Sequence, residues 1–128
     1  MKPEQARRDY DAQGYVLIRN ALIPGEVEQV REAFDRAADK GELRDVLNQD
    51  DVFVDMVDHP VLLPIVQAIV GDDIQLRYAQ GGVIKPHTES GSGWHCDLSG
   101  IMGVYLPDSI IMTKLFTYLE DVPVPGLR

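Results

Sequence analysis

The residues with the clearest chemical meaning in this sequence are His95 and Asp97, which flank one cysteine after Gly93-Trp94. In an extended chain, residues two apart project from the same side, so the imidazole and the carboxylate are expected to converge. These are two of the three protein ligands in the 2-His-1-carboxylate triad, which holds non-haem Fe(II) and leaves coordination positions open. We therefore predict that His95 and Asp97 bind a metal ion. No histidine follows His95, so the sequence does not visibly complete the triad.

The assignment of His95 and Asp97 as metal ligands has an alternative, and so does the conclusion that the third ligand is missing. A His-x-Asp pair is common and usually marks a polar surface. His87 could supply a third ligand from the same chain, but the loop it occupies favours an ordinary polar residue. His59 stands beside Pro60 and is interpreted as a helix-start residue without a chemical role.

Length and composition exclude several classes of protein. The chain has 128 residues, enough for one hydrophobic core, and its net charge of -9 argues against a nucleic-acid partner. No apolar run approaches the roughly 20 residues that span a bilayer. The polar N-terminus is unlike a secretory signal, and the single cysteine excludes an internal disulfide. These features predict a cytoplasmic protein with no membrane partner.

The hydrophobic pattern predicts helices in the first part of the chain and strands in the second. Apolar residues at spacings of three and four predict one helix from Pro24 to Lys40 and another from Pro60 to Gly71. Residues 43–58 are less regular and suggest a short helix with a loop. The predicted strands cover residues 15–19, 74–78, 83–85, 100–106 and 110–119. This order predicts an α+β fold in which helices pack on one side of a sheet or partial barrel.

The last apolar run, 110–119, is continuous and is therefore expected to form a buried central strand. A chain that stopped soon after such a strand would leave an open sheet edge. This predicts either that the chain is the first part of something longer or that a second copy pairs with the edge.

Four motifs in order give the sequence a resemblance to the phytanoyl-CoA dioxygenase family of Fe(II)/2-oxoglutarate oxygenases. Each motif is weak alone, but their order and spacing extend over nearly the whole chain. They are Gly14-Tyr15-Val16-Leu17-Ile18 with Leu22-Ile23-Pro24; His59-Pro60-Val61-Leu62-Leu63 with Val70-Gly71; Ile84-Lys85-Pro86 with Trp94-His95-Cys96-Asp97; and Leu115-Phe116-Thr117-Tyr118-Leu119-Glu120-Asp121.

The resemblance implies a single partial domain over residues 1–128. Residues 1–71 would be its mainly helical part, and residues 72–128 the first strands of a truncated double-stranded β-helix, or jelly roll. Family members are about twice as long, and their distal iron histidine and the arginine that binds 2-oxoglutarate come later. Pro125-Gly126-Leu127 resembles the start of the family's next turn, without its asparagine.

The resemblance also implies a function. Fe(II) would bind His95, Asp97 and the missing histidine, and 2-oxoglutarate and O2 would be consumed while an unactivated C–H bond of a small organic substrate is hydroxylated. Lys114 matches a position that contacts 2-oxoglutarate in some members, and Tyr78 and Gln80 would line the same cavity. The alternative for Lys114 is a lysine that reaches water from an apolar strand. The family does not use the position of His87.

The isolated chain is expected to be inactive, because it lacks the distal histidine and the arginine. The alternative to an enzyme fragment is a non-catalytic half-barrel. Such a protein would bind metal weakly or not at all and would act through its open edge.

Overall fold

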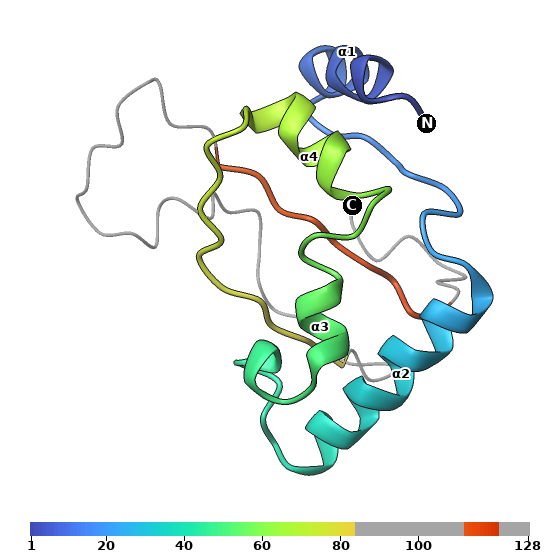
Figure 1. Cartoon of the computed structure of the whole chain (residues 1–128), viewed down its shortest axis with the longest axis vertical. Coiled ribbons are helices and arrows are strands. Elements are labelled where there is room, and N and C mark those ends of the chain that lie inside the picture. The colour runs from blue at the N-terminus through green and yellow to red at the C-terminus, as the bar shows by residue number, and fades with distance from the viewer. Residues whose placement is uncertain (84–111, 121–128) are drawn as a thin grey trace, which may run out of the picture.

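The structure is a computed structural model that describes residues 1–83 and 112–120, and all structural statements concern these residues. Four α-helices and one short 3-10 helix, η1, are joined by extended and irregular segments (Figure 1). In chain order they are α1 (Pro3–Gln13), α2 (Pro24–Asp39), η1 (Val46–Asn48), α3 (Asp51–Asp55) and α4 (Leu63–Val70).

Helix α2 confirms the prediction made from its apolar spacing. Pro24 occupies the first turn, where its missing N–H costs nothing. The Glu26 carboxylate accepts a hydrogen bond from the Ile23 backbone N–H (2.8 Å) and so satisfies one free donor at this end. The apolar residues whose spacing predicted this helix are mostly covered. Val30 and Ala37 are buried, and Phe34 is partly buried and packs against the core.

Helices α2, η1 and α3 enclose one hydrophobic cluster. Its buried members are Val30, Ala33, Val46 and Phe53. Ala79 and Leu119, which come from the two extended segments later in the chain, also pack against this cluster. The helical half of the molecule therefore anchors both segments.

Helices α1 and α4 pack together around a second cluster. Ala6 of α1 is buried against Ile65 and Ile69 of α4, and Val16 and Ile18 cover the cluster from the following segment. The sequence pattern did not predict α1, because Ala6 is its only buried residue and the rest of the helix is polar. It did predict the end of α4 at Gly71, whose positive φ of 97° suits glycine.

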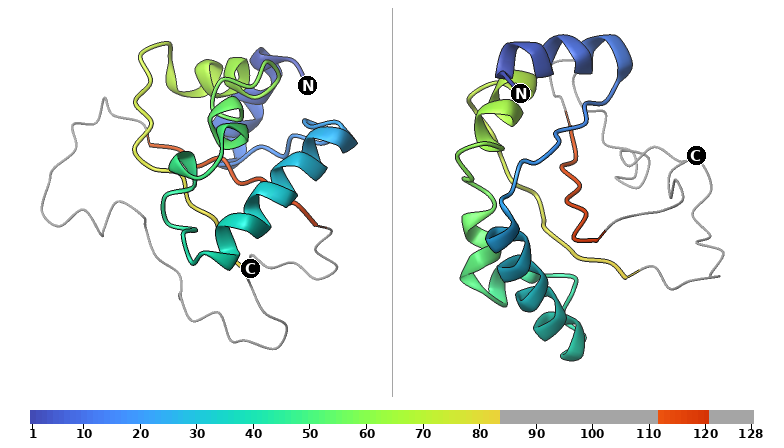
Figure 2. Two further views of the ribbon diagram at one scale, coloured as in Figure 1. Left: turned by 60° about the horizontal axis from the view of Figure 1, so that its bottom comes forward. Right: turned by 90° about the vertical axis from the view of Figure 1, so that its right-hand side faces the viewer.

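The helices and the extended segments lie in different layers. Viewed edge-on in Figure 2 (right), α2, α3 and α4 form one layer, and segments 72–83 and 112–120 run along one side of it. The segment after α1 alternates as an extended chain should. Tyr15 and Leu17 are exposed, whereas Val16 and Ile18 face the core.

The predicted α+β fold with a jelly-roll sheet is wrong for the described residues, which contain helices and no strand. Segments 15–18, 74–83 and 112–118 do not pair as strands, although their sequences have strand-forming patterns. The physical reason is that alternation fixes which side a residue faces, while a sheet also needs ladder hydrogen bonds to a neighbour. The Gly81 backbone N–H instead donates to the Leu43 carbonyl (2.8 Å), and this bond is not part of a sheet ladder.

The expectation of a buried central strand at 110–119 is also wrong where the chain is described. Residues 114–118 are exposed, and among residues 112–120 only Met112, Thr113 and Leu119 are partly covered. The sheet edge expected to pair with a second copy is accordingly not seen in the described residues. The predicted strand at 100–106 lies outside them.

Candidate functional site

The predicted site residues fall into two groups. His95, Asp97 and His87 lie outside the described residues, so the structure gives no geometry for the predicted metal ligands. Lys114, Tyr78 and Gln80 are described, and they come from the two extended segments on the side of the helical layer.

Lys114 and Tyr78 lie close together. The Lys114 Nζ atom is 5.9 Å from the centre of the Tyr78 ring and 5.9 Å from the centre of the Phe116 ring. Both distances are within the range in which an ammonium group is attracted to the face of an aromatic ring. Lys114 therefore projects between two aromatic side chains, one from each extended segment.

One residue of each segment packs against the helical core, whereas the proposed site residues are exposed. Ala79 faces the helical core, so its neighbours Tyr78 and Gln80 project from the opposite side. Leu119 likewise faces the core, whereas Lys114 and Phe116 are exposed. The outer side of the two segments thus presents a cation, two aromatic rings and an amide.

The environment of this group is open and only partly apolar. Tyr78 is 46% exposed and Phe116 is 63% exposed, and Gln80 is exposed as well. Lys114 thus avoids the desolvation cost that a lysine inside a buried strand would incur. Of the two interpretations of Lys114, its exposure agrees with a lysine that reaches water.

No metal centre is present in the described part of the chain. Residues 1–83 and 112–120 contain no group of three His, Cys, Asp or Glu side chains that could hold a metal ion. Within the same residues, no helix is long and apolar enough to cross a bilayer.

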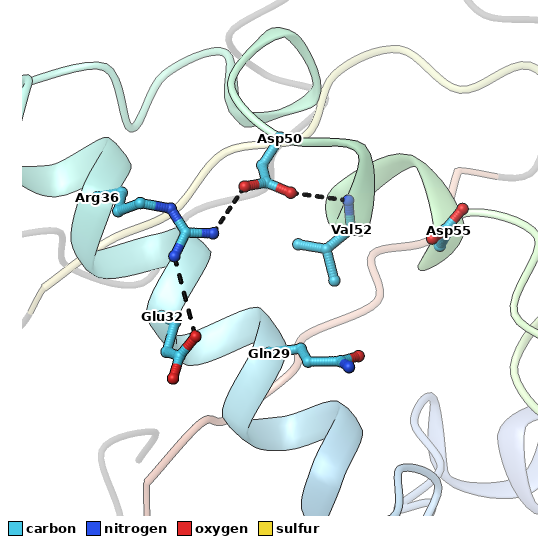
Figure 3. Close-up of a pocket in the computed structure, with 6 residues that line it drawn as sticks. All are labelled: Gln29, Glu32, Arg36, Asp50, Val52 and Asp55. Atoms are coloured by element: carbon cyan, nitrogen blue, oxygen red, sulfur yellow. Dashed lines mark hydrogen bonds and ion pairs between the residues drawn. The ribbon is translucent and has the colours of Figure 1, made fainter.

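A polar pocket that the sequence pattern did not predict lies between α2 and α3 (Figure 3). Its volume is about 290 Å³. Its lining is formed by Gln29, Glu32, Arg36, Asp50, Val52 and Asp55. Arg36 donates to Asp50 (2.7 Å) and lies 4.0 Å from Glu32, so its charge is already balanced.

Asp50 connects the two helices that form this pocket. It is the N-cap of α3, where one carboxylate oxygen accepts from the Val52 backbone N–H (3.2 Å) and the other from Arg36. The hydrogen bond from Arg36, followed by that from Val52, lowers the pKa of the Asp50 carboxyl below its usual value. On the exposed face of α2, the hydrogen bond to Glu28 raises the pKa of Arg31.

His59 is the buried polar residue of the described chain, at 8% exposure. Its Nδ1 atom accepts from the Val61 backbone N–H (3.2 Å), and its carbonyl accepts from Leu62 and Leu63 at the start of α4. Its Nε2 atom lies 3.4 Å from Glu26 Oε1. His59 thus lies in the turn that precedes α4, which begins at Leu63 and not at Pro60 as predicted. The contact with α2 is an addition that spacing could not reveal.

Comparison of the chain with protein-family models, with curated proteins and with solved structures found no match in any of the three. The resemblance noted in the sequence therefore rests on the motifs themselves.

Proposed function

We propose that the chain is part of an Fe(II)/2-oxoglutarate-dependent oxygenase that hydroxylates a small organic substrate. In this proposal His95 and Asp97 hold the metal, Lys114 binds a carboxylate of 2-oxoglutarate, and Tyr78 and Gln80 line the co-substrate site. The overall reaction converts a C–H bond, O2 and 2-oxoglutarate into an alcohol, succinate and CO2.

The observation that carries the proposal is the contact between Lys114 and Tyr78. The resemblance matched Lys114 to a position that contacts 2-oxoglutarate, and Tyr78 was expected to line the same cavity, although the two residues lie far apart in the sequence. The Lys114 Nζ atom lies 5.9 Å from the centre of the Tyr78 ring, on the same side of the helical layer. An exposed ammonium beside two aromatic rings can bind a carboxylate by a charge-assisted hydrogen bond.

The chemistry of the proposed ligands fits the ion. An imidazole and a carboxylate suit non-haem Fe(II), and bound iron would supply the redox chemistry of the reaction. The residues of this chain would hold the metal, orient the co-substrate and limit access of water. His95 and Asp97 supply two of the three protein ligands of the triad, so this chain is expected to bind metal weakly and to form no succinate beyond free iron.

Binding of 2-oxoglutarate tests the role of Lys114. Isothermal titration with Mn(II) present should show weak binding to the wild-type chain and at least tenfold weaker binding to Lys114→Met, since a hydrogen bond to a charged group contributes about 1.5–3 kcal/mol. Lys40→Met removes a positive charge at the end of α2 and serves as the control. Equal loss in both variants would mean that Lys114 has no specific role.

Metal binding tests the other half of the proposal independently. Titration of Mn(II) into the wild-type chain, His95→Ala and Asp97→Ala should show reduced affinity in both variants. His59→Ala is the control, because His59 is buried against Glu26. Undiminished binding in both site variants would exclude His95 and Asp97 as ligands.

A non-catalytic binding protein is the second candidate. Large apolar side chains exposed on the extended segments favour it, among them Leu76, Phe116 and Tyr118. Analytical ultracentrifugation over a range of concentrations, together with the metal titration, separates the candidates. Self-association without metal binding would favour the second candidate.

A further inference from the structure

The backbone at Gly81 makes an unusually close approach to the helical layer. A Cβ atom built on Gly81 would lie 2.2 Å from Cε2 of Phe34 and 3.2 Å from Cδ2 of Leu43. The first distance is far below van der Waals contact, so any larger residue must displace the Phe34 ring or the segment itself. Phe34 packs against the core cluster of α2, which opposes movement of the ring.

A hydrogen bond fixes the same residue from another direction. The Gly81 N–H donates to the Leu43 carbonyl (2.8 Å), just beyond the C-terminal end of α2. The segment is therefore held by its backbone at Gly81 and by the Ala79 side chain in the core. Gly82, the next residue, is exposed, and a Cβ atom added to it would have no other atom within 4 Å.

The segment that is held at Gly81 also carries Tyr78. Tyr78 is three residues away in the same extended segment and projects from the side opposite to Ala79. Lys114 reaches the Tyr78 ring from the second extended segment, which Leu119 attaches to the same cluster. Both segments are thus attached to one hydrophobic cluster, and the contact between them depends on how closely each approaches it.

We infer that Gly81 is a positioning residue, whose lack of a side chain lets its segment approach Phe34 closely enough to bring Tyr78 under Lys114. It acts through the backbone and touches neither the ammonium nor a ligand. A role of Gly81 in 2-oxoglutarate binding rests on the proposed function, whereas its role in bringing Tyr78 to Lys114 does not.

Nuclear magnetic resonance of the full chain tests the inference through the Lys114 ε-methylene protons. Two nearby rings should displace these signals upfield from the values of a free lysine. Gly81→Ala should remove much of this displacement, whereas the matched variant Gly82→Ala should retain it. Retention in Gly81→Ala, or equal loss in Gly82→Ala, would overturn the inference, whatever the result of the co-substrate titration.

A second variant decides the outcome if Gly81→Ala does not fold. Phe34→Leu removes the Cε2 atom responsible for the closest approach and keeps an apolar side chain in the cluster. The double variant Phe34→Leu with Gly81→Ala should fold and recover part of the upfield displacement. If Phe34→Leu alone folds, but the double variant neither folds nor recovers the upfield displacement, steric contact with Phe34 is not the reason for glycine at this position.

Discussion

The Nζ atom of Lys114 lies 5.9 Å from the centre of the Tyr78 ring, and this contact joins two segments that share no strand pairing in the described residues. A contact between side chains therefore connects these two segments, whereas backbone hydrogen bonds would connect two strands of a sheet. The contact is exposed, so water and salt weaken it.

The energetic coupling between Lys114 and Tyr78 should be small but measurable. A double-mutant cycle with Lys114→Met and Tyr78→Leu should give an interaction of about 0.5–1 kcal/mol, typical of an exposed cation and aromatic ring. Urea unfolding of the four chains measures it. A cycle in which Tyr15→Leu replaces Tyr78→Leu should give no coupling, and coupling of similar size there would show a nonspecific effect.

Arg7 should contribute to the packing of α1 on α4. Its Nη1 atom donates to the carbonyls of Ile69 (2.7 Å) and Ala68 (3.2 Å), which lie in the last turn of α4, where helix carbonyls lack intrahelical partners. Arg7→Met should lower the free energy of unfolding by about 1.5–2 kcal/mol, the lower part of the range for hydrogen bonds to charged groups.

Arg8 supplies the control for this prediction, because it is on the same helix and its guanidinium donates to Gln5 in an exposed bond. Arg8→Met should change the free energy of unfolding by much less. Similar losses in both variants would assign the effect of Arg7 to net charge and not to the α4 carbonyls.

His59 has two separable structural roles, one before α4 and one against the first turn of α2. His59→Asn can still accept a hydrogen bond from the Val61 N–H through its short amide, but it cannot span the distance to Glu26. His59→Ala loses both contacts. We expect His59→Ala to cost about 2 kcal/mol of unfolding free energy and His59→Asn to cost less, as urea unfolding would measure.

The variant Glu26→Gln separates the helix-capping role of Glu26 from its contact with His59, because it keeps an acceptor for the Ile23 N–H. Glu26→Ala should be less stable than Glu26→Gln in thermal and urea unfolding, because Ala also leaves the start of α2 without its cap. Equal stability of these two variants would contradict the capping role.

Asp50 should make stability depend on pH in the acid range. Because Arg36 and Val52 lower its pKa in the folded chain, the stabilisation is fully present above the unfolded value of about 3.9 and is lost as pH falls through the lower folded value. Asp50→Asn should therefore show a smaller fall in stability than the wild-type chain as the pH is lowered from neutral through this range.

Urea unfolding at several pH values measures this difference. Asp51→Asn provides a matched control, because Asp51 lies in the first turn of α3 but is not the residue that Arg36 contacts. An unchanged pH profile in Asp50→Asn would show that the pair with Arg36 does not persist in solution.

Local chemistry made part of this fold predictable. Pro24 and the apolar spacing after it predicted α2, and Gly71 predicted the end of α4, because proline and glycine restrict the backbone at helix ends. The alternating pattern of residues 15–18 is also kept, with Val16 and Ile18 facing inward. The pattern failed for α1, where a single small residue, Ala6, makes the buried contact and Arg7 adds hydrogen bonds to a distant helix.

The sequence by itself predicted α2, the end of α4 and the inward-facing residues of segment 15–18, and it proposed His95, Asp97 and Lys114 for chemistry. Tertiary structure decided that the extended segments attach to a helical cluster and do not pair as strands in the described residues. It also decided that Lys114 meets Tyr78 and that Gly81 approaches Phe34. Side-chain patterns specify the direction in which a residue faces, but long-range contacts depend on which surfaces come together in space, and no local pattern records that choice.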